Sequence, residues 1–159
     1  MAHGVNIAEE CHVVQVRYPI DVDTLAGAAM RIVNTRLYGH ATFILQLGVT
    51  GAATTITLAE DANATPAGGT PIDFAYYVED TASGDVLSAR TMTAAAAGFA
   101  TSVNDNITYV IEVDCNQMTD GFHYLELRQS DPGAATTCAC VCILSGARYT
   151  QPESPSVLT

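Results

Sequence analysis

Few residues in this sequence have the spacing that catalysis or metal binding requires. The four histidines are far apart in the chain, and none falls in a His-Glu-x-x-His or His-x-His pattern. We therefore expect no metal site, and His12 and His40 are interpreted as strand or strand-end residues. No Gly-x-Ser-x-Gly elbow and no glycine-rich phosphate-binding fingerprint occurs. The sequence predicts no catalytic residue and no cofactor, and hence a protein that is not an enzyme.

Acidic residues offer two weaker alternatives. Paired carboxylates can hydrolyse glycosides, and four acids flank one predicted strand and its turn: Asp73, Glu79, Asp80 and Asp85. A hydrolase would need Asp73 or Glu79 in one cleft with a second acid. Tryptophan, a common sugar platform, is absent. The Asn104–Asn106 turn, with Asp61 and Asn63, could ligate calcium, but the EF-hand spacing is missing and such residues are ordinary turn formers.

The five cysteines show neither a zinc nor a disulfide pattern. Cys138, Cys140 and Cys142 alternate, so in a strand their thiols face the same way in a straight row. Successive members would lie roughly 6.5–7 Å apart, too far for a disulfide and not convergent enough for zinc. We expect them to be small buried apolar side chains.

The charge balance excludes several partners. The chain has 17 acidic residues and six arginines, no lysine, and a net charge of −11. Such a chain is repelled by phosphate backbones and anionic lipid surfaces, so neither nucleic acid nor membrane is expected as a partner. The N-terminal ten residues lack the basic and apolar regions of a secretory signal. We therefore expect synthesis in a cytoplasm, with reduced thiols.

Period-two alternation predicts a body built of strands. The clearest runs are Ala41–Val49 and Ile107–Asp114. In the first, one face carries Phe43, Leu45, Leu47 and Val49, and the other carries Thr42, Ile44 and Gln46. Further strands are predicted at 11–18, 54–59, 72–79, 124–129 and 136–144, with a weaker one at 86–92. The 41–49 and 54–59 runs are predicted to pair as a hairpin, and 94–98 could form one helical turn.

These runs are separated by turn residues, and helices long enough for an α/β sheet are missing. The chain of 159 residues is therefore predicted to be all-β, an antiparallel β-sandwich or jelly roll of about eight strands. We divide it into an N-terminal arm (1–10), a β-sandwich domain (11–149) and a C-terminal tail (150–159).

The two ends are the candidate partner contacts. The arm carries apolar residues outside the strand pattern, and the tail is extended by prolines and ends in two apolar residues. Such arms often become ordered against a partner, although frayed termini are the common alternative. The residues expected to contact a partner are Val5, Ile7, Pro152, Pro155, Val157 and Leu158.

Several strings carry a family resemblance. They are Tyr38–Leu58, Asn104–Asp114, Asp120–Leu127, the Ser130–Gly133 turn and Leu144–Tyr149. Together they resemble the head decoration, or cement, proteins of tailed bacteriophages over roughly residues 35–150. The resemblance implies a structural virion protein on the capsid exterior that binds the major capsid protein, as a homotrimer, and clamps neighbouring capsomers. It brings no catalytic residues.

Two other functions remain open from the residues themselves. One is a carbohydrate-binding β-sandwich that serves in adhesion or receptor recognition, suggested by the fold class and by Tyr76, Tyr77, Tyr109 and Tyr124. The other is the hydrolase described above. Capsid binding, a glycan array and the positions of the carboxylates distinguish the three.

Overall fold

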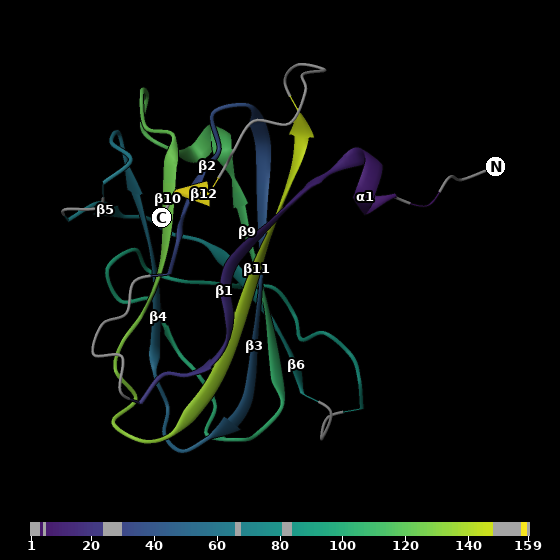
Figure 1. Ribbon diagram of the computed structural model, residues 1–159, viewed down its shortest axis with the longest axis vertical. Helices are drawn as coiled ribbons and strands as arrows, with labels where there is room; N and C mark the ends of the chain where they lie inside the picture. Colours follow the sequence, from purple (N-terminus) through teal and green to yellow (C-terminus); the bar gives the residue numbers. More distant parts are fainter. Residues whose placement is uncertain are drawn as a thin grey trace.

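The computed structural model describes residues 4, 6–23, 30–65, 68–80, 84–147 and 157–158 (Figure 1). Strands dominate these residues, and the helical elements are short: α1 (Ile7–Glu10) and the 3-10 turn η2 (Cys115–Gln117). All strand pairs are antiparallel, and they form two sheets that pack face to face. The predicted all-β sandwich is therefore confirmed.

The larger sheet, called sheet A, has the order β1 (His12–Asp21), β11 (Thr136–Ala147), β3 (Tyr38–Thr50), β9 (Ile107–Asp114), β6 (Ala75–Asp80) and β7 (Thr91–Met92). Sheet B has the order β12 (Val157–Leu158), β2 (Ile32–Asn34), β10 (Tyr124–Gln129), β4 (Thr55–Asp61) and β5 (Thr70–Pro71), with β8 (Phe99–Ala100) also paired to β4.

Alternating side chains of both sheets fill the space between them. Each strand of a sandwich turns every second residue inward, and here those residues are apolar. Sheet A contributes Phe43, Leu45, Ile111 and the row of three cysteines, while sheet B contributes Ile56, Leu58, Leu125 and Leu127, all of them buried. Polar contacts also cross the interior to Gln129 Oε1 of β10, which accepts from buried Arg17 of β1 at 2.6 Å and from the Cys138 thiol of β11 at 3.3 Å.

Most predicted strands lie where the alternation placed them. β9 and β10 have the predicted bounds, while β3 and β11 extend beyond the predicted runs. β1 continues through Pro19, beyond the predicted end of this strand at Tyr18. Proline is tolerated there because β1 is an edge strand and its pairing with β11 shifts register between Arg17 and Ile20.

The predicted hairpin of 41–49 with 54–59 is wrong. β3 belongs to sheet A and β4 to sheet B, so the chain crosses from one sheet to the other between them. The crossing turn packs tightly at Gly51, where a Cβ atom would lie 2.7 Å from the carbonyl oxygen of Ala135. Turn residues between two apolar runs look alike in sequence whether the chain forms a hairpin or a corner.

The weak strand predicted at 86–92 is reduced to β7, Thr91–Met92. Val86 and Leu87 are instead exposed in an irregular loop. At 94–98 the chain makes one isolated turn, in which the Ala97 and Gly98 amides both donate to Ala94 O, and a bridge between Ala94 and Gly98 closes it.

The two ends of the chain occupy different places. α1 has no buried residue and projects from the upper end of β1, away from the sandwich (Figure 1). At the other end, Val157 pairs with Val33 and Leu158 with Ile32, so β12 extends sheet B. No helix among the described residues is long and apolar enough to cross a membrane.

An aromatic cluster closes the core beside β8. Phe99 stacks on Tyr76, with ring centroids 4.1 Å apart, and also contacts Phe74 and Tyr109. Gly98 lets Phe99 reach this place. Its φ is +57°, and a Cβ atom on it would overlap with the carbonyl oxygen of Ile56 on β4.

Replacing Gly98 with alanine should therefore destabilise the fold. A left-handed non-glycine residue costs on the order of 1–3 kcal/mol, and the overlap with β4 adds to this cost. The measurement is the free energy of unfolding by denaturant titration. Gly133→Ala is the matched control, because Gly133 has a φ of +66° but open space around it. Equal losses in the two variants would contradict the close approach of β8 to β4.

Candidate interaction surface

The outer face of sheet A, which is turned away from sheet B, is lined by cross-strand rows. The register aligns one row across five strands, in the order Gln15, Val141, Ile44, Val110 and Tyr77. The row above it runs Val13, Ile143, Thr42, Glu112, Ala75 and Met92. Partners in such rows point to the same side of the sheet.

The middle of this face is apolar and carries no charge. In most antiparallel sandwiches the outer face is polar, because it meets water. Here Ile44 on the central strand lies between Val141 and Val110, and all three are only partly covered. A contiguous apolar row that is left partly open to solvent is a candidate interaction site.

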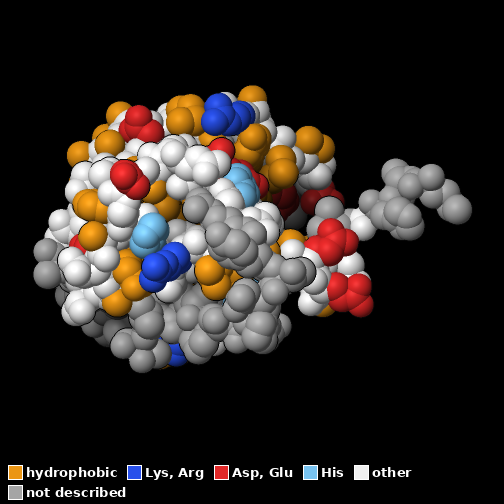
Figure 2. Space-filling model, turned by 90° about the horizontal axis from the view of Figure 1, so that it is seen from above, with side chains coloured by type: hydrophobic (Ala, Val, Ile, Leu, Met, Phe, Trp, Pro, Cys, Tyr) orange, Lys and Arg blue, Asp and Glu red, His pale blue; other side chains and the backbone are white. Residues whose placement is uncertain are grey.

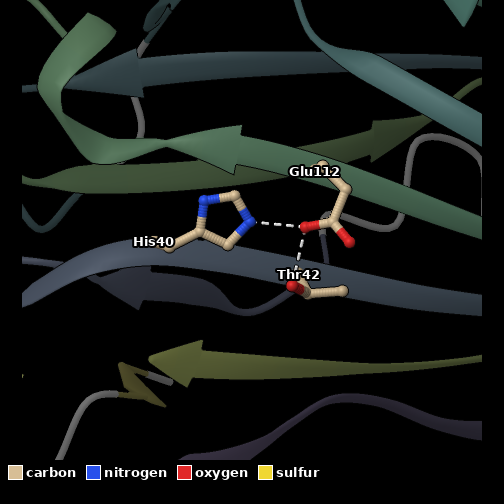
Figure 3. A network of polar contacts seen from close by, with 3 residues as sticks. All are labelled: His40, Thr42 and Glu112. Atoms are coloured by element: carbon tan, nitrogen blue, oxygen red, sulfur yellow. Dashed lines mark hydrogen bonds and ion pairs between the residues drawn. The ribbon is translucent and has the colours of Figure 1, made fainter. Parts of the chain in front are cut away.

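The upper end of the face holds a polar network and a groove. His40 Nε2 lies 2.5 Å from Glu112 Oε2, and the Thr42 hydroxyl donates to the same oxygen at 2.8 Å (Figure 3). The three residues come from neighbouring strands, β3 and β9. The groove, which we call the upper groove, has a volume of about 520 Å³ and is lined by these three residues and by Ala75, Tyr77, Arg90, Met92, Asp114 and Gln117.

This network is not arranged as a nucleophilic triad. In a hydrolytic triad the imidazole lies between the carboxylate and the hydroxyl and takes the hydroxyl proton. Here the Glu112 carboxylate lies between His40 and Thr42, and Figure 3 shows both side chains directed at it. The arrangement ties β3 to β9, and the Thr42 hydroxyl donates to the carboxylate instead of to the imidazole.

A second hollow lies at the lower end of the same face, and we call it the lower hollow. Its volume is about 330 Å³. No Asp, Glu, Lys or Arg side chain lines it. The lining residues are Pro19, Gln46, Leu47, Gly48, Asn106, Thr108, Thr137, Cys138 and Ala139.

The carboxylates that the sequence analysis considered for hydrolysis do not come together. Asp73 precedes β6 and accepts a hydrogen bond from the Ala95 amide, whereas Glu79, Asp80 and Asp85 lie at or beyond the opposite end of that strand. Six residues of strand separate the ends by about 20 Å.

The calcium candidates are also far apart, on opposite ends of the sandwich. Asp105 accepts from the Thr50 amide at 2.7 Å, and Asp61 from the Asn63 amide at 2.7 Å. Asp61 thus shapes a local turn, whereas Asp105 links the loop before β9 to the end of β3. Among the described residues, no group of three or more His, Cys, Asp or Glu side chains could hold a metal ion.

The four tyrosines suggested for sugar binding are dispersed. Tyr109 is buried and Tyr76 stacks on Phe99 inside the core. Tyr77 faces outward beside the upper groove, and Tyr124 lies on β10 of sheet B.

The predicted partner-contact residues fall in three groups. Ile7 is on the projecting helix, with 46% of its surface exposed. Val157 and Leu158 form the backbone pairing of β12 with β2. Val5, Pro152 and Pro155 lie outside the described residues.

The surface around the N-terminal segment is unevenly charged. Seen from above, acidic side chains gather on the lobe that projects beside the body, and hydrophobic and uncharged side chains make up much of the rest (Figure 2). The helix in this lobe carries Glu9 and Glu10 in its first turn.

The cysteine row is part of the core, as predicted. Cys138, Cys140 and Cys142 are buried and free. Burial raises the pKa of all three thiols, because the interior disfavours the thiolate. For Cys138 the nearby Arg17 guanidinium opposes this rise but does not cancel it. These thiols are therefore neutral and poor nucleophiles in the folded protein.

The outer face of sheet A and its polar network were not predicted from the sequence. His40 and Glu112 are 72 positions apart, and no motif joins them. The sequence did contain one indication of an apolar outer face, because Ile44 lies on the side of its strand opposite Phe43 and Leu45. Comparison with protein-family models, curated proteins and solved structures finds no match to this chain.

Thiol labelling should separate the buried cysteines from the remaining one. In the native protein at pH 8, below the raised pKa values, we expect one thiol, Cys11, to react rapidly with a disulfide reagent. It is the only cysteine among the five that is not buried. All five should react after denaturation. Rapid labelling of Cys138, Cys140 or Cys142 in the native state, located by peptide mapping, would contradict the packing of the row.

Proposed function

We propose that this chain is a structural virion protein that attaches to the outer surface of a bacteriophage head. In this proposal it is made in the host cytoplasm, binds the major capsid protein and holds neighbouring capsomers together as a head decoration protein. It acts as a homotrimer, without cofactor or catalytic residue. Jelly-roll connectivity belongs to the proposal, supported by the crossings between sheets from β3 to β4 and from β10 to β11.

The observation that carries the proposal is the uncharged apolar row across the outer face of sheet A. Interface cores are depleted in charged residues, and a broad flat sheet face suits contact with a protein lattice better than with a small ligand. Ile44, Val110 and Val141 form the centre of this row. The resemblance in sequence to decoration proteins supports the same function.

The charge distribution agrees with this role. The net charge of −11 favours solubility of a densely covered particle, while the neutral row can meet a partner without placing like charges together. A protein that binds the assembled shell and not its separated subunits adds its binding free energy to the stability of the shell. Many copies on one particle raise the avidity.

The chain ends belong to the proposal as secondary contacts. Ile7 projects with α1, where it can reach beyond the sandwich. In the tail, Val157 and Leu158 pair with β2 of the same chain. A partner would therefore contact them at the unpaired edge of β12, or after β12 has separated from β2. Val5, Pro152 and Pro155 complete the proposed set.

A charge placed in the apolar row should weaken capsid binding. We expect Ile44→Glu to raise the dissociation constant for undecorated capsids roughly tenfold or more, equivalent to about 1.4 kcal/mol, because a carboxylate would be buried against the lattice. Co-sedimentation with capsids measures the binding. Thr70→Glu on the exposed strand β5 of sheet B is the matched control. Capsid binding unchanged by Ile44→Glu, with its fold verified by circular dichroism, would count against this face.

Removal of the arm tests the second contact. Deleting residues 1–10 should leave the melting temperature nearly unchanged, since α1 buries none of its residues, but should reduce capsid occupancy at limiting protein concentration. Differential scanning calorimetry and cryo-electron microscopy of decorated particles provide the two measurements. Full occupancy by the truncated chain would remove the arm from the proposal.

Carbohydrate binding is the second candidate function. The observation in its favour is the upper groove, where Tyr77 and Met92 lie among hydrogen-bonding side chains such as Glu112 and Gln117. A glycan array tests it directly. A specific hit that is lost in Tyr77→Ala, together with no binding to capsids, would replace the capsid proposal with this one.

A further inference from the structure

Acidic side chains lie on both sides of the apolar row, at the part of it that β9 and β6 form. On β9, Glu112 follows Val110 by two residues, and on β6, Glu79 follows Tyr77 by two residues. Since every second residue of a strand points to the same face, both carboxylates lie on the outer face of sheet A. The two strands are antiparallel, so Glu112 is above the row and Glu79 is below it.

One oxygen of Glu79 lacks a partner. Its Oε1 atom is buried and accepts no hydrogen bond, although buried polar atoms in folded proteins are almost always paired. Glu79 pairs in register with Thr108, which lines the lower hollow. Because this oxygen is already shielded from water in the free chain, a hydrogen-bond donor from a partner would satisfy it with little further desolvation.

Glu112 also keeps one free acceptor. Its Oε2 atom takes the contacts from His40 and Thr42, whereas Oε1 accepts no hydrogen bond from any described residue (Figure 3). Glu112 lines the upper groove, and its cross-strand neighbour there is Ala75, the smallest side chain of its row. The small side chain leaves room beside the carboxylate for the end of an inserted side chain.

The charges around the upper groove favour a cationic occupant. Two carboxylates, Glu112 and Asp114, line the groove together with one guanidinium, Arg90. Arg90 forms no ion pair with either carboxylate, and the chain as a whole has a net charge of −11. Ammonium and guanidinium groups form strong charge-assisted hydrogen bonds with carboxylates, so a partner with cationic side chains complements this surface.

The spacing of the two glutamates determines the pattern of such a partner. Glu79 is four residues along β6 from Ala75, the neighbour of Glu112, and four residues of strand span about 13–14 Å. In an extended partner segment, side chains four positions apart have the same separation and face the same way, as does the residue midway between them. That middle residue would lie over Val110 and Tyr77 of the apolar row.

We infer that the partner of this face presents an extended segment in which one apolar side chain is flanked by two cationic ones, each two positions away. One cation enters the upper groove at Glu112, the other donates to Glu79, and the apolar side chain packs on the row. A second copy does not supply this pattern, because the chain has no lysine and no two of its six arginines are four positions apart. The inference rests on the proposed function, since it describes the part of the major capsid protein that meets this face.

A short peptide tests the pattern without any capsid. The probe is the capped pentapeptide Arg-Thr-Val-Thr-Arg, titrated into the full chain and followed by the backbone amide signals in NMR spectra. We expect shift changes centred on residues 77–79 and 110–112, and weaker binding at higher salt. The peptide with Glu in place of both Arg residues should not bind, and the peptide with Ser in place of Val should bind more weakly. No shift changes on this face, or equal binding of the Arg and Glu peptides, would overturn the inference.

Neutral variants separate this contact from general attraction between a basic peptide and an acidic protein. Glu79→Gln and Glu112→Gln should each weaken peptide binding roughly two- to fivefold, the range of an exposed ion pair. Glu9→Gln is the matched control, because it removes the same charge from α1 and should leave binding unchanged. Equal losses in all three variants, or no loss in the first two, would contradict the inferred contacts.

Charge reversal adds a readout in which binding is gained. With Glu79→Arg and Glu112→Arg together, the chain should bind the Glu peptide and lose the Arg peptide. Unchanged preference for the Arg peptide in the folded double variant would overturn the inference. If circular dichroism shows that the double variant does not fold, the two neutral variants decide.

Co-sedimentation with undecorated capsids relates the inference to the proposed function. Both neutral variants should bind capsids more weakly than the wild-type chain does, and the Arg peptide should compete with capsids. If the peptide binds as expected but capsids are not bound, the proposed function falls and the inferred chemistry of the partner stands. If capsids bind the wild-type chain and both neutral variants equally, and the peptide does not compete, the proposed function stands and the inference falls.

Discussion

The hydrogen-bonded ladder of β11, β3 and β9 determines where every surface of this protein lies. Its register is not specified by hydrophobic alternation alone, because β3 carries apolar side chains on both faces: Phe43 and Leu45 inward and Ile44 outward. A slip by one residue would exchange these faces at less cost than in a sheet with one polar side. The ladder therefore needs polar contacts that are satisfied in only one alignment.

Such contacts exist at both ends of the β3–β9 pair. At the upper end the Glu112 carboxylate joins His40 and Thr42, and at the lower end the Asp105 carboxylate accepts from the Thr50 amide. The outer network is thus better understood as a register device than as a reaction centre. By fixing the alignment, it also fixes which apolar side chains reach the outer surface.

The sequence predicted the elements whose alternation is local and complete. β9 and β10 match their predicted bounds because apolar residues alternate through β9 and over Leu125 and Leu127 of β10, and turn residues flank both strands. Pairing between strands was predicted less well. The turn at Gly51 leads to a corner between sheets, and only its close approach to Ala135 distinguishes it from a hairpin. Steric information of this kind is not carried by residue type.

The partly or fully exposed apolar side chains could not be predicted from the sequence, for a related reason. Val86 and Leu87 resemble the start of a strand in sequence, but the sheet edge they would join is already satisfied by Ser88. Likewise, the sequence places Ile44 on the outer face of a half-buried strand. That this face is apolar becomes evident only once Val141 and Val110 are known to be its cross-strand neighbours. Which side chains share a surface made from several strands depends on how those strands pair. In a single sequence, only the turns between strands indicate that pairing.

The return of the tail to sheet B has a practical consequence for engineering. Because β12 pairs with β2, Leu158 lies in sheet B, the layer opposite the outer face of sheet A. A cargo domain fused after this strand would depart from that layer, leaving the apolar row and the lower hollow unobstructed. The end of β12 is therefore the better point for such a fusion, whereas a fusion ahead of α1 would add bulk where β1 of sheet A begins.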